Sequence, residues 1–189
     1  APAPAIVAPA QDPRDVLGDG SVRGEVLAAA QRLVGVKTPF DEARFLAHLL
    51  GAADLDLVSE ADPQMAIKAV YDSLDAGSRT FSAGTTPEPG DLVFFSNTFD
   101  RDQDGRSDDW FTMAGVVESA QGNGTVIFIG VFQGEVKRMV FSPSRPSAER
   151  GSDGVVLNSA IRDRSLSDRP FTKYLAGELF ASYGRLQDE

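Results

Sequence analysis

The stretch from Gly90 to Ser119 constrains the fold of this chain most tightly, because it holds two strand-like runs joined by one acidic loop. The first run, 91–95, reads DLVFF, and the second, 111–117, reads FTMAGVV. Short apolar runs that are rich in Val and Phe and bounded by turn residues are typical of buried strands. We therefore expect two strands here, with the acidic loop as their connection.

The connecting loop has the alternating aspartates of a calcium-binding loop. Gly105 falls at the sixth loop position, where such a loop turns sharply, and Phe111 falls at the twelfth, where the usual bidentate glutamate is absent. The pattern predicts a structural calcium ion, either in a weak site or with an aspartate in place of that glutamate. The alternative is a solvated loop that binds nothing. The predicted ligands are Asp100, Asp102, Asp104, Arg106 through its backbone carbonyl, Asp108 and, as the substitute, Asp109.

Three helices are expected before this stretch. The spacing of apolar residues predicts the first over 22–33. Thr38 is the expected N-cap of the second, which then ends at Gly51. The third is expected to open at Asp62-Pro63 and to end before Gly77. Its expected buried side consists of Met65, Ala66, Ala69, Val70 and Leu74.

After the acidic loop, strand-like runs alternate with glycine-containing turns, which predicts an antiparallel meander over 111–118, 125–131 and 136–141. Helices first and strands afterwards indicate an α+β fold, with N-terminal helices packed on an antiparallel sheet. Further along the chain we expect a short strand at 155–161, a short helix at 174–179, and a helix end or a closing strand at 180–186.

Length and composition narrow the classes of protein. Residues 1–15 are Ala/Pro-rich and are expected to form a flexible linker, which leaves 16–189 as a single domain. The net charge of -10 argues against nucleic acid and against anionic membrane surfaces as partners. The chain has no cysteine and a single histidine, His48, which excludes a thiol nucleophile and a multi-histidine metal site. No apolar run reaches the about 18 residues of a membrane span.

The order of these motifs resembles the NlpC-type and CHAP-type cell-wall peptidases, which are papain-like cysteine hydrolases of peptidoglycan. Phe40-Asp41 matches the lead-in to the helix that carries the family's cysteine. Pro89 to Phe95 matches the family's Gly-Asp-Leu-Val-Phe-Phe strand, and Ala114 to Glu118 matches the segment after its histidine. The resemblance implies a papain-like NlpC-type core over roughly 22–186.

The resemblance also implies that catalysis is lost. Glu42 stands at the position of the family's cysteine, Met113 at that of its histidine, and Gly130 near that of its third polar residue. A carboxylate beside a methionine provides neither a thiolate to attack an amide carbonyl nor an imidazole to carry the proton. We therefore expect a pseudoenzyme whose former active-site groove is lined by these three residues.

Three functions stay open for such a protein. The groove binds peptidoglycan stem peptides or a peptide of a partner protein without cleaving it; the chain is an exported scaffold that docks another protein; or Glu42 serves as the general base of a different hydrolase. The family resemblance, the linker-like start and the calcium loop together predict a periplasmic or extracellular location.

Overall fold

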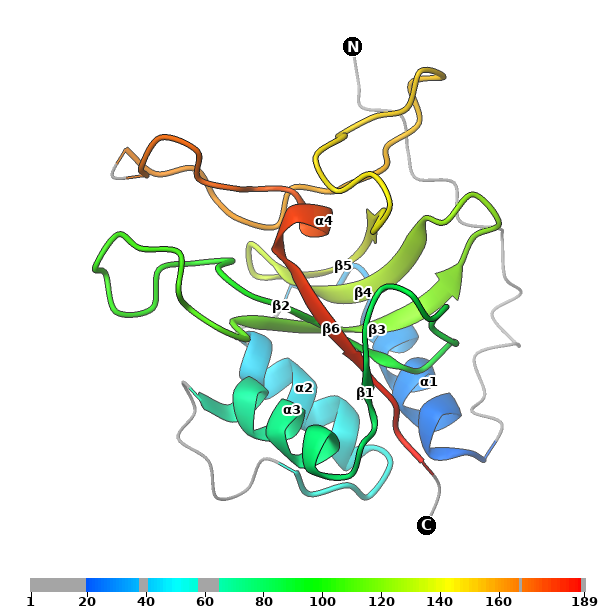
Figure 1. The fold of residues 1–189 in the computed structure, drawn as a ribbon. Coiled ribbons are helices and arrows are strands. Elements are labelled where there is room, and N and C mark those ends of the chain that lie inside the picture. Colours follow the sequence, from blue (N-terminus) through cyan, green and yellow to red (C-terminus); the bar gives the residue numbers. More distant parts are fainter. Residues whose placement is uncertain (1–19, 38–40, 58–64, 167, 188–189) are drawn as a thin grey trace.

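The structure is a computed structural model that describes residues 20–37, 41–57, 65–166 and 168–187, so the expected linker at 1–15 lies outside it. It is an α+β fold built on an antiparallel sheet of six strands in the order β1-β6-β2-β3-β4-β5 (Figure 1). Among the described residues, no helix is long and apolar enough to cross a membrane.

The first two helices have side-chain caps. Helix α1 (Val22–Leu33) begins after Ser21, whose hydroxyl accepts a hydrogen bond from the Gly24 N–H, and its bounds are those expected. Helix α2 (Glu42–Gly51) is capped by Asp41, which accepts from the Arg44 N–H. The expected N-cap, Thr38, is therefore wrong by one turn, because the Asp41 carboxylate caps the helix that begins at Glu42. The end expected at Gly51 is confirmed.

Helix α3 (Ala66–Ala76) ends before Gly77, as expected, while Asp62-Pro63 lies outside the described residues. Its buried residues are Ala66, Ile67, Val70 and Leu74. The expectation for Met65 is wrong, since its side chain precedes the helix and is 39% exposed.

The strands confirm the meander. Strands β2 (Leu92–Phe95), β3 (Met113–Ala120), β4 (Val126–Phe132) and β5 (Glu135–Phe141) pair antiparallel in chain order. After the short helix α4 (Ala176–Leu179), β6 (Phe180–Gly184) returns beside β2, and the two-residue β1 (Thr80–Phe81) pairs with its outer edge. The last element of the sheet is thus a closing strand. From the sequence, either a closing strand or a helix end was expected here.

The expected strand at 155–161 does not form. Only isolated bridges occur there, between Arg150 and Val156 and between Ala160 and Leu175. The fully buried Asn158 holds this region instead: its Nδ2 donates to the Arg145 and Ala148 carbonyls, and its Oδ1 accepts from two backbone N–H groups. A side-chain amide therefore takes the place of a strand ladder.

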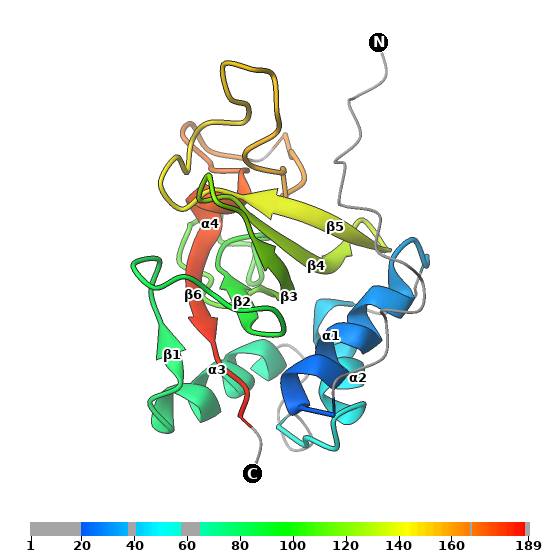
Figure 2. The ribbon, with the colours of Figure 1, turned by 90° about the vertical axis from the view of Figure 1, so that its right-hand side faces the viewer.

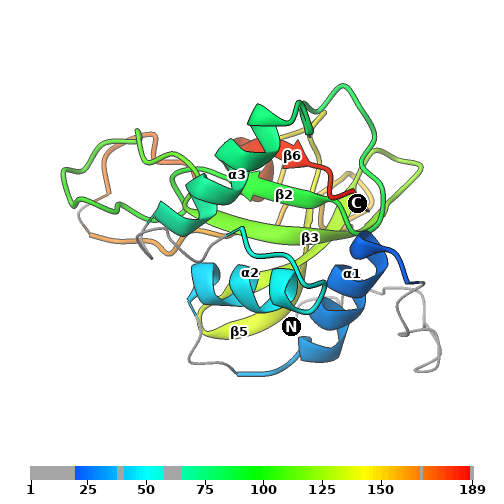
Figure 3. The same ribbon diagram turned by 90° about the horizontal axis from the view of Figure 1, so that it is seen from below.

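Two apolar layers flank the sheet. Helices α1, α2 and α3 pack on one face, with Leu92, Phe94, Ala114 and Val116 beneath them. Helix α4 covers the other face, over Val93, Phe95, Met113 and Val117. Figures 1 and 2 show the three helices below the sheet and the loops of 142–166 and 168–175 above it, and Figure 3 shows the helices from below. Alternate residues of β2 and β3 therefore enter different cores, as the pleat of a strand requires.

A buried ionic cluster fixes the start of β2. Asp91 is 0% exposed, and its carboxylate accepts from Arg185 through Nε at 3.1 Å and Nη2 at 2.8 Å. The Glu88 N–H donates to the same carboxylate at 2.8 Å, and Arg23 Nη1 lies 3.7 Å from it. The aspartate of the GDLVFF motif thus joins α1, β2 and the segment after β6.

Candidate functional site

The three expected groove residues do not face one another. Glu42 begins α2, on the helix-covered side of the sheet. Met113 is 1% exposed and packs in the opposite core with Met139. A Cβ built on Gly130 would lie 3.0 Å from Met113 Cε and 3.2 Å from Met139 Cε, so Gly130 opens onto the same core. A groove lined by all three residues is therefore absent from this structure, because the strand pleat directs Met113 away from α2.

Glu42 does line a cavity, of about 730 Å³. Its walls come from the start of α2, the acidic loop, the turn between β4 and β5, and the segment 161–172. Burial raises the pKa of the Glu42 carboxyl, and the neighbouring Asp41 carboxylate adds to this rise. The charged lining residues are Glu42, Asp100, Asp104, Arg106, Arg162, Asp163, Asp168 and Arg169.

A second cavity of about 250 Å³ adjoins the first. Ser107, Arg162 and Thr172 line both cavities and form their common wall. Beyond them, Phe171, Lys173 and Glu178 line the smaller cavity. The acidic loop and the segment 161–172 lie beside each other at this end of the molecule (Figure 1). We refer to the two adjoining cavities as the groove.

Arg162 is held rigidly at the junction. Its Nη1 donates to the Asn97 carbonyl at 2.7 Å, and its Nη2 donates to Asp168 Oδ1 at 3.2 Å. Asp168 also accepts from Tyr174 Oη at 2.8 Å and from the Ser165 N–H at 2.7 Å, and these donors lower the pKa of its carboxyl. The bonds of Arg162 use two of its five N–H groups, which leaves donors for an acceptor in the groove.

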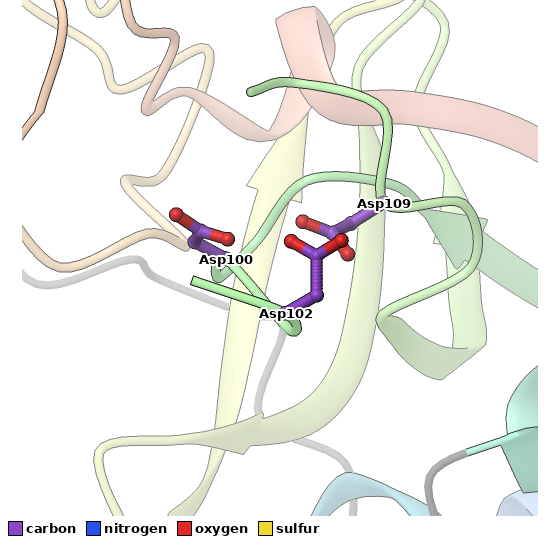
Figure 4. Close-up of side chains that lie close together, drawn as sticks. All are labelled: Asp100, Asp102 and Asp109. Atoms are coloured by element: carbon purple, nitrogen blue, oxygen red, sulfur yellow. The ribbon is translucent and has the colours of Figure 1, made fainter. Parts of the chain in front are cut away.

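The acidic loop gathers three of its aspartates. One carboxylate oxygen from each of Asp100, Asp102 and Asp109 lies within 4.8 Å of the others (Figure 4). Asp109 is 8% exposed, and its pKa is raised by burial first and then by the carboxylates of Asp102 and Asp100. Asn97 pins the two ends of the loop together, since its N–H donates to the Asp109 carbonyl at 2.8 Å and its side chain accepts from the Asp109 N–H at 2.9 Å.

The rest of the predicted ligand set lies outside this triad. Asp104 Oδ1 accepts from the Arg106 N–H at 2.7 Å, and its Oδ2 lies 3.4 Å from Arg106 Nε. Asp108 is exposed. Within the triad, Asp100 Oδ2 accepts from the Gly105 N–H at 2.8 Å, whereas Asp100 Oδ1 is buried without a hydrogen-bond partner among the described residues. Three converging carboxylates with an unpartnered buried oxygen suit a hard cation, which prefers oxygen ligands.

The sequence does not predict Arg162, Asp168 or Thr172 as site residues, although they line the groove. They lie in a polar stretch without periodicity, IRDRSLSDRPFT, in which the density of Arg and Asp is the only signal. Comparisons of the chain with family models, with curated proteins and with solved structures find no match.

Proposed function

We propose that this protein is a non-catalytic binding domain of the NlpC-type and CHAP-type kind, which takes a peptide in the groove beside its acidic loop. The observation that carries the proposal is the groove itself: two adjoining cavities of about 730 and 250 Å³ that carry both cationic and anionic side chains. A site with both charges suits a peptide, which presents carbonyls, amides and charged groups along its length. A peptidoglycan stem peptide and a segment of a partner protein both fit this description.

Loss of catalysis follows from the chemistry of the residues in the family's positions. Without a cysteine in the chain, no thiolate is formed, and Met113 lies in the core on the far side of the sheet from Glu42. The order of elements supports the relationship, since the helices precede the meander and β2 carries the GDLVFF motif. An exported scaffold that docks another protein is compatible with the same observations. We propose a periplasmic or extracellular location for the protein in both cases.

A hydrolase that uses Glu42 is the second candidate, because Glu42 and Asp100 line the same cavity and because the pKa of Glu42 is raised. A carboxylic acid with a raised pKa beside other carboxylates is a feature of general acid–base sites. Release of soluble peptides from purified sacculi by the wild type, and its loss in Glu42→Gln, would favour this candidate. We expect no release from either protein.

We further propose that the triad of Asp100, Asp102 and Asp109 binds calcium, and that the ion orders the loop that forms one wall of the groove. Extracellular calcium modules have dissociation constants of roughly 10⁻⁴–10⁻³ M. Ten millimolar calcium would then stabilise the folded state by about 1.4–2.7 kcal/mol. For a domain of this size, that corresponds to a rise in melting temperature of roughly 3–10 °C.

Differential scanning fluorimetry in calcium and in chelator tests the site. The double variant Asp102→Ala and Asp104→Ala is expected to remove the calcium-dependent rise in melting temperature. Asp109→Asn is expected to remove this rise as a single substitution. Asp108→Asn is the matched control, since Asp108 is exposed and lies outside the triad. A wild-type melting temperature that does not change in millimolar calcium would exclude the site.

Binding is tested by a pull-down with purified peptidoglycan sacculi, in calcium and in chelator. Calcium-dependent capture supports the stem peptide as the ligand. Absence of capture in both buffers removes the stem peptide and leaves the partner-protein segment.

A further inference from the structure

Phe171 combines two unfavourable features, and no contact among the described residues compensates for them. Its side chain is 99% exposed, and its backbone has φ +73°, in the left-handed region that favours glycine. It occupies the third position of the turn Arg169-Pro170-Phe171-Thr172, in which the Thr172 N–H donates to the Arg169 carbonyl at 3.1 Å. Proline at the second position and a positive φ at the third are features of a type II turn, where glycine is the usual third residue.

Phe111 also has a positive φ, but its side-chain contacts compensate for the backbone strain. It has a similar backbone conformation, with φ +54°, but its ring stacks on Tyr71 with the ring centroids 3.9 Å apart. Phe111 also packs against the helix-side core, so its strained backbone is offset by buried apolar area. The ring of Phe171 has no such contacts, and its backbone strain therefore gives no stability in return.

The position of Phe171 supplies a reason for both features. It lines the smaller cavity together with Arg162 and Lys173. The larger cavity, which Arg162 also lines, has further apolar wall residues in Phe99, which is 42% exposed, and in Phe132. The groove thus combines an exposed aromatic ring, the guanidinium of Arg162 and further apolar wall residues.

We propose that the groove binds an extended segment of a partner protein, with one large apolar side chain of that segment packed on Phe171 and a carbonyl or carboxylate oxygen bonded to Arg162. This inference rests on the proposed binding function and selects the protein segment over the stem peptide. A fully exposed phenyl ring at a site entrance gains most from a large apolar partner, which is the typical chemistry of the dominant contact in a protein interface.

Panning a phage-displayed random dodecapeptide library on the wild-type protein in calcium provides the probe, and the enriched peptides are then measured by fluorescence polarisation. We expect them to share an aromatic or large aliphatic residue. Phe171→Gly is expected to weaken their binding by about tenfold, because one apolar side-chain contact is lost. Its melting temperature is expected to equal or exceed that of the wild type, because glycine accepts the positive φ.

Ser78→Gly is the matched control, since Ser78 is exposed and has φ +54° but lies outside the groove. It is expected to raise the melting temperature in the same way and to bind the peptides as the wild type does. Peptides that bind Phe171→Gly within about twofold of the wild type overturn the inference. Sacculus binding without any enriched peptide overturns it too but leaves the proposed function standing, whereas the absence of both kinds of binding overturns both.

Discussion

Replacing Arg185 by methionine tests the ionic cluster that anchors β2. Arg185 holds the buried Asp91 carboxylate through two hydrogen bonds, at 3.1 and 2.8 Å. Methionine keeps much of the apolar stem and removes the charge, so Asp91 would stay buried with the Glu88 N–H at 2.8 Å and Arg23 at 3.7 Å as its remaining partners. A buried carboxylate whose charge is only partly balanced is the main consequence of this substitution.

The expected loss of folding free energy is about 3 kcal/mol, at the lower end of the roughly 3–5 kcal/mol for breaking a buried ion pair. The lower end applies because the Arg185 side chain is 30% exposed and Arg23 keeps part of the electrostatic balance. For a domain of this size, the melting temperature should fall by roughly 6–12 °C. Urea unfolding at neutral pH, followed by circular dichroism, measures the loss directly.

Arg23→Met is the matched control, because the main partner of Arg23 is Glu88, whose side chain is 53% exposed. Pairs of this kind contribute about 0–1 kcal/mol. Asp91→Asn in the Arg185→Met background should recover part of the loss, since the amide no longer carries a charge that needs neutralising. If Arg185→Met lowers the free energy of unfolding no more than Arg23→Met does, Asp91 does not depend on the Arg185 guanidinium.

Two further predictions concern Glu42 and the sheet glycines. Because burial raises the pKa of Glu42 in the folded state, the wild type should lose stability as pH rises from the ordinary glutamic acid pKa to that raised value. Glu42→Gln should therefore unfold at higher temperature than the wild type at neutral pH and at the same temperature in acid; equal melting temperatures at both would contradict this. Gly115→Ala should cost about 1–3 kcal/mol, because its Cβ would lie 2.7 Å from the Ile129 carbonyl oxygen. Gly130→Ala should cost less, since its nearest neighbours are the terminal methyl groups of Met113 at 3.0 Å and Met139 at 3.2 Å, and the Ala114 carbonyl oxygen lies at an ordinary 3.6 Å. Urea midpoints of the two variants decide, and equal losses would contradict the comparison.

Much of the fold was predictable because its signals are local. The bounds of α1 follow from apolar spacing at three and four residues, and the meander follows from short apolar runs between glycine turns. The region 155–161 was mispredicted as a strand because its apolar residues resemble one, whereas the buried Asn158 amide supplies its hydrogen bonds. The hydrogen bonds of that amide join residues 10 to 19 positions apart and leave no local pattern.

In the acidic loop, the spacing of the aspartates predicts the place of the candidate cation site but not its exact set of ligands. The sequence predicted six ligands on this loop, and the structure brings three of them, Asp100, Asp102 and Asp109, close together. The spacing was not enough to exclude Asp104 or Asp108, because the direction of each side chain depends on the local backbone hydrogen bonds, such as the bond from the Arg106 N–H to Asp104.

By itself, the sequence determined the class of fold, the absence of a thiol nucleophile and the place of the acidic loop, since each depends on residue identity or on neighbours along the chain. Only the tertiary structure decided that Met113 and Gly130 enter the core and that Glu42, Arg162 and Phe171 lie along a groove. Strands β2, β3 and β4 are buried on both faces, so their apolar pattern carries no mark of which residue points to which side. Register and long-range packing supply that information, and neither is written in local sequence.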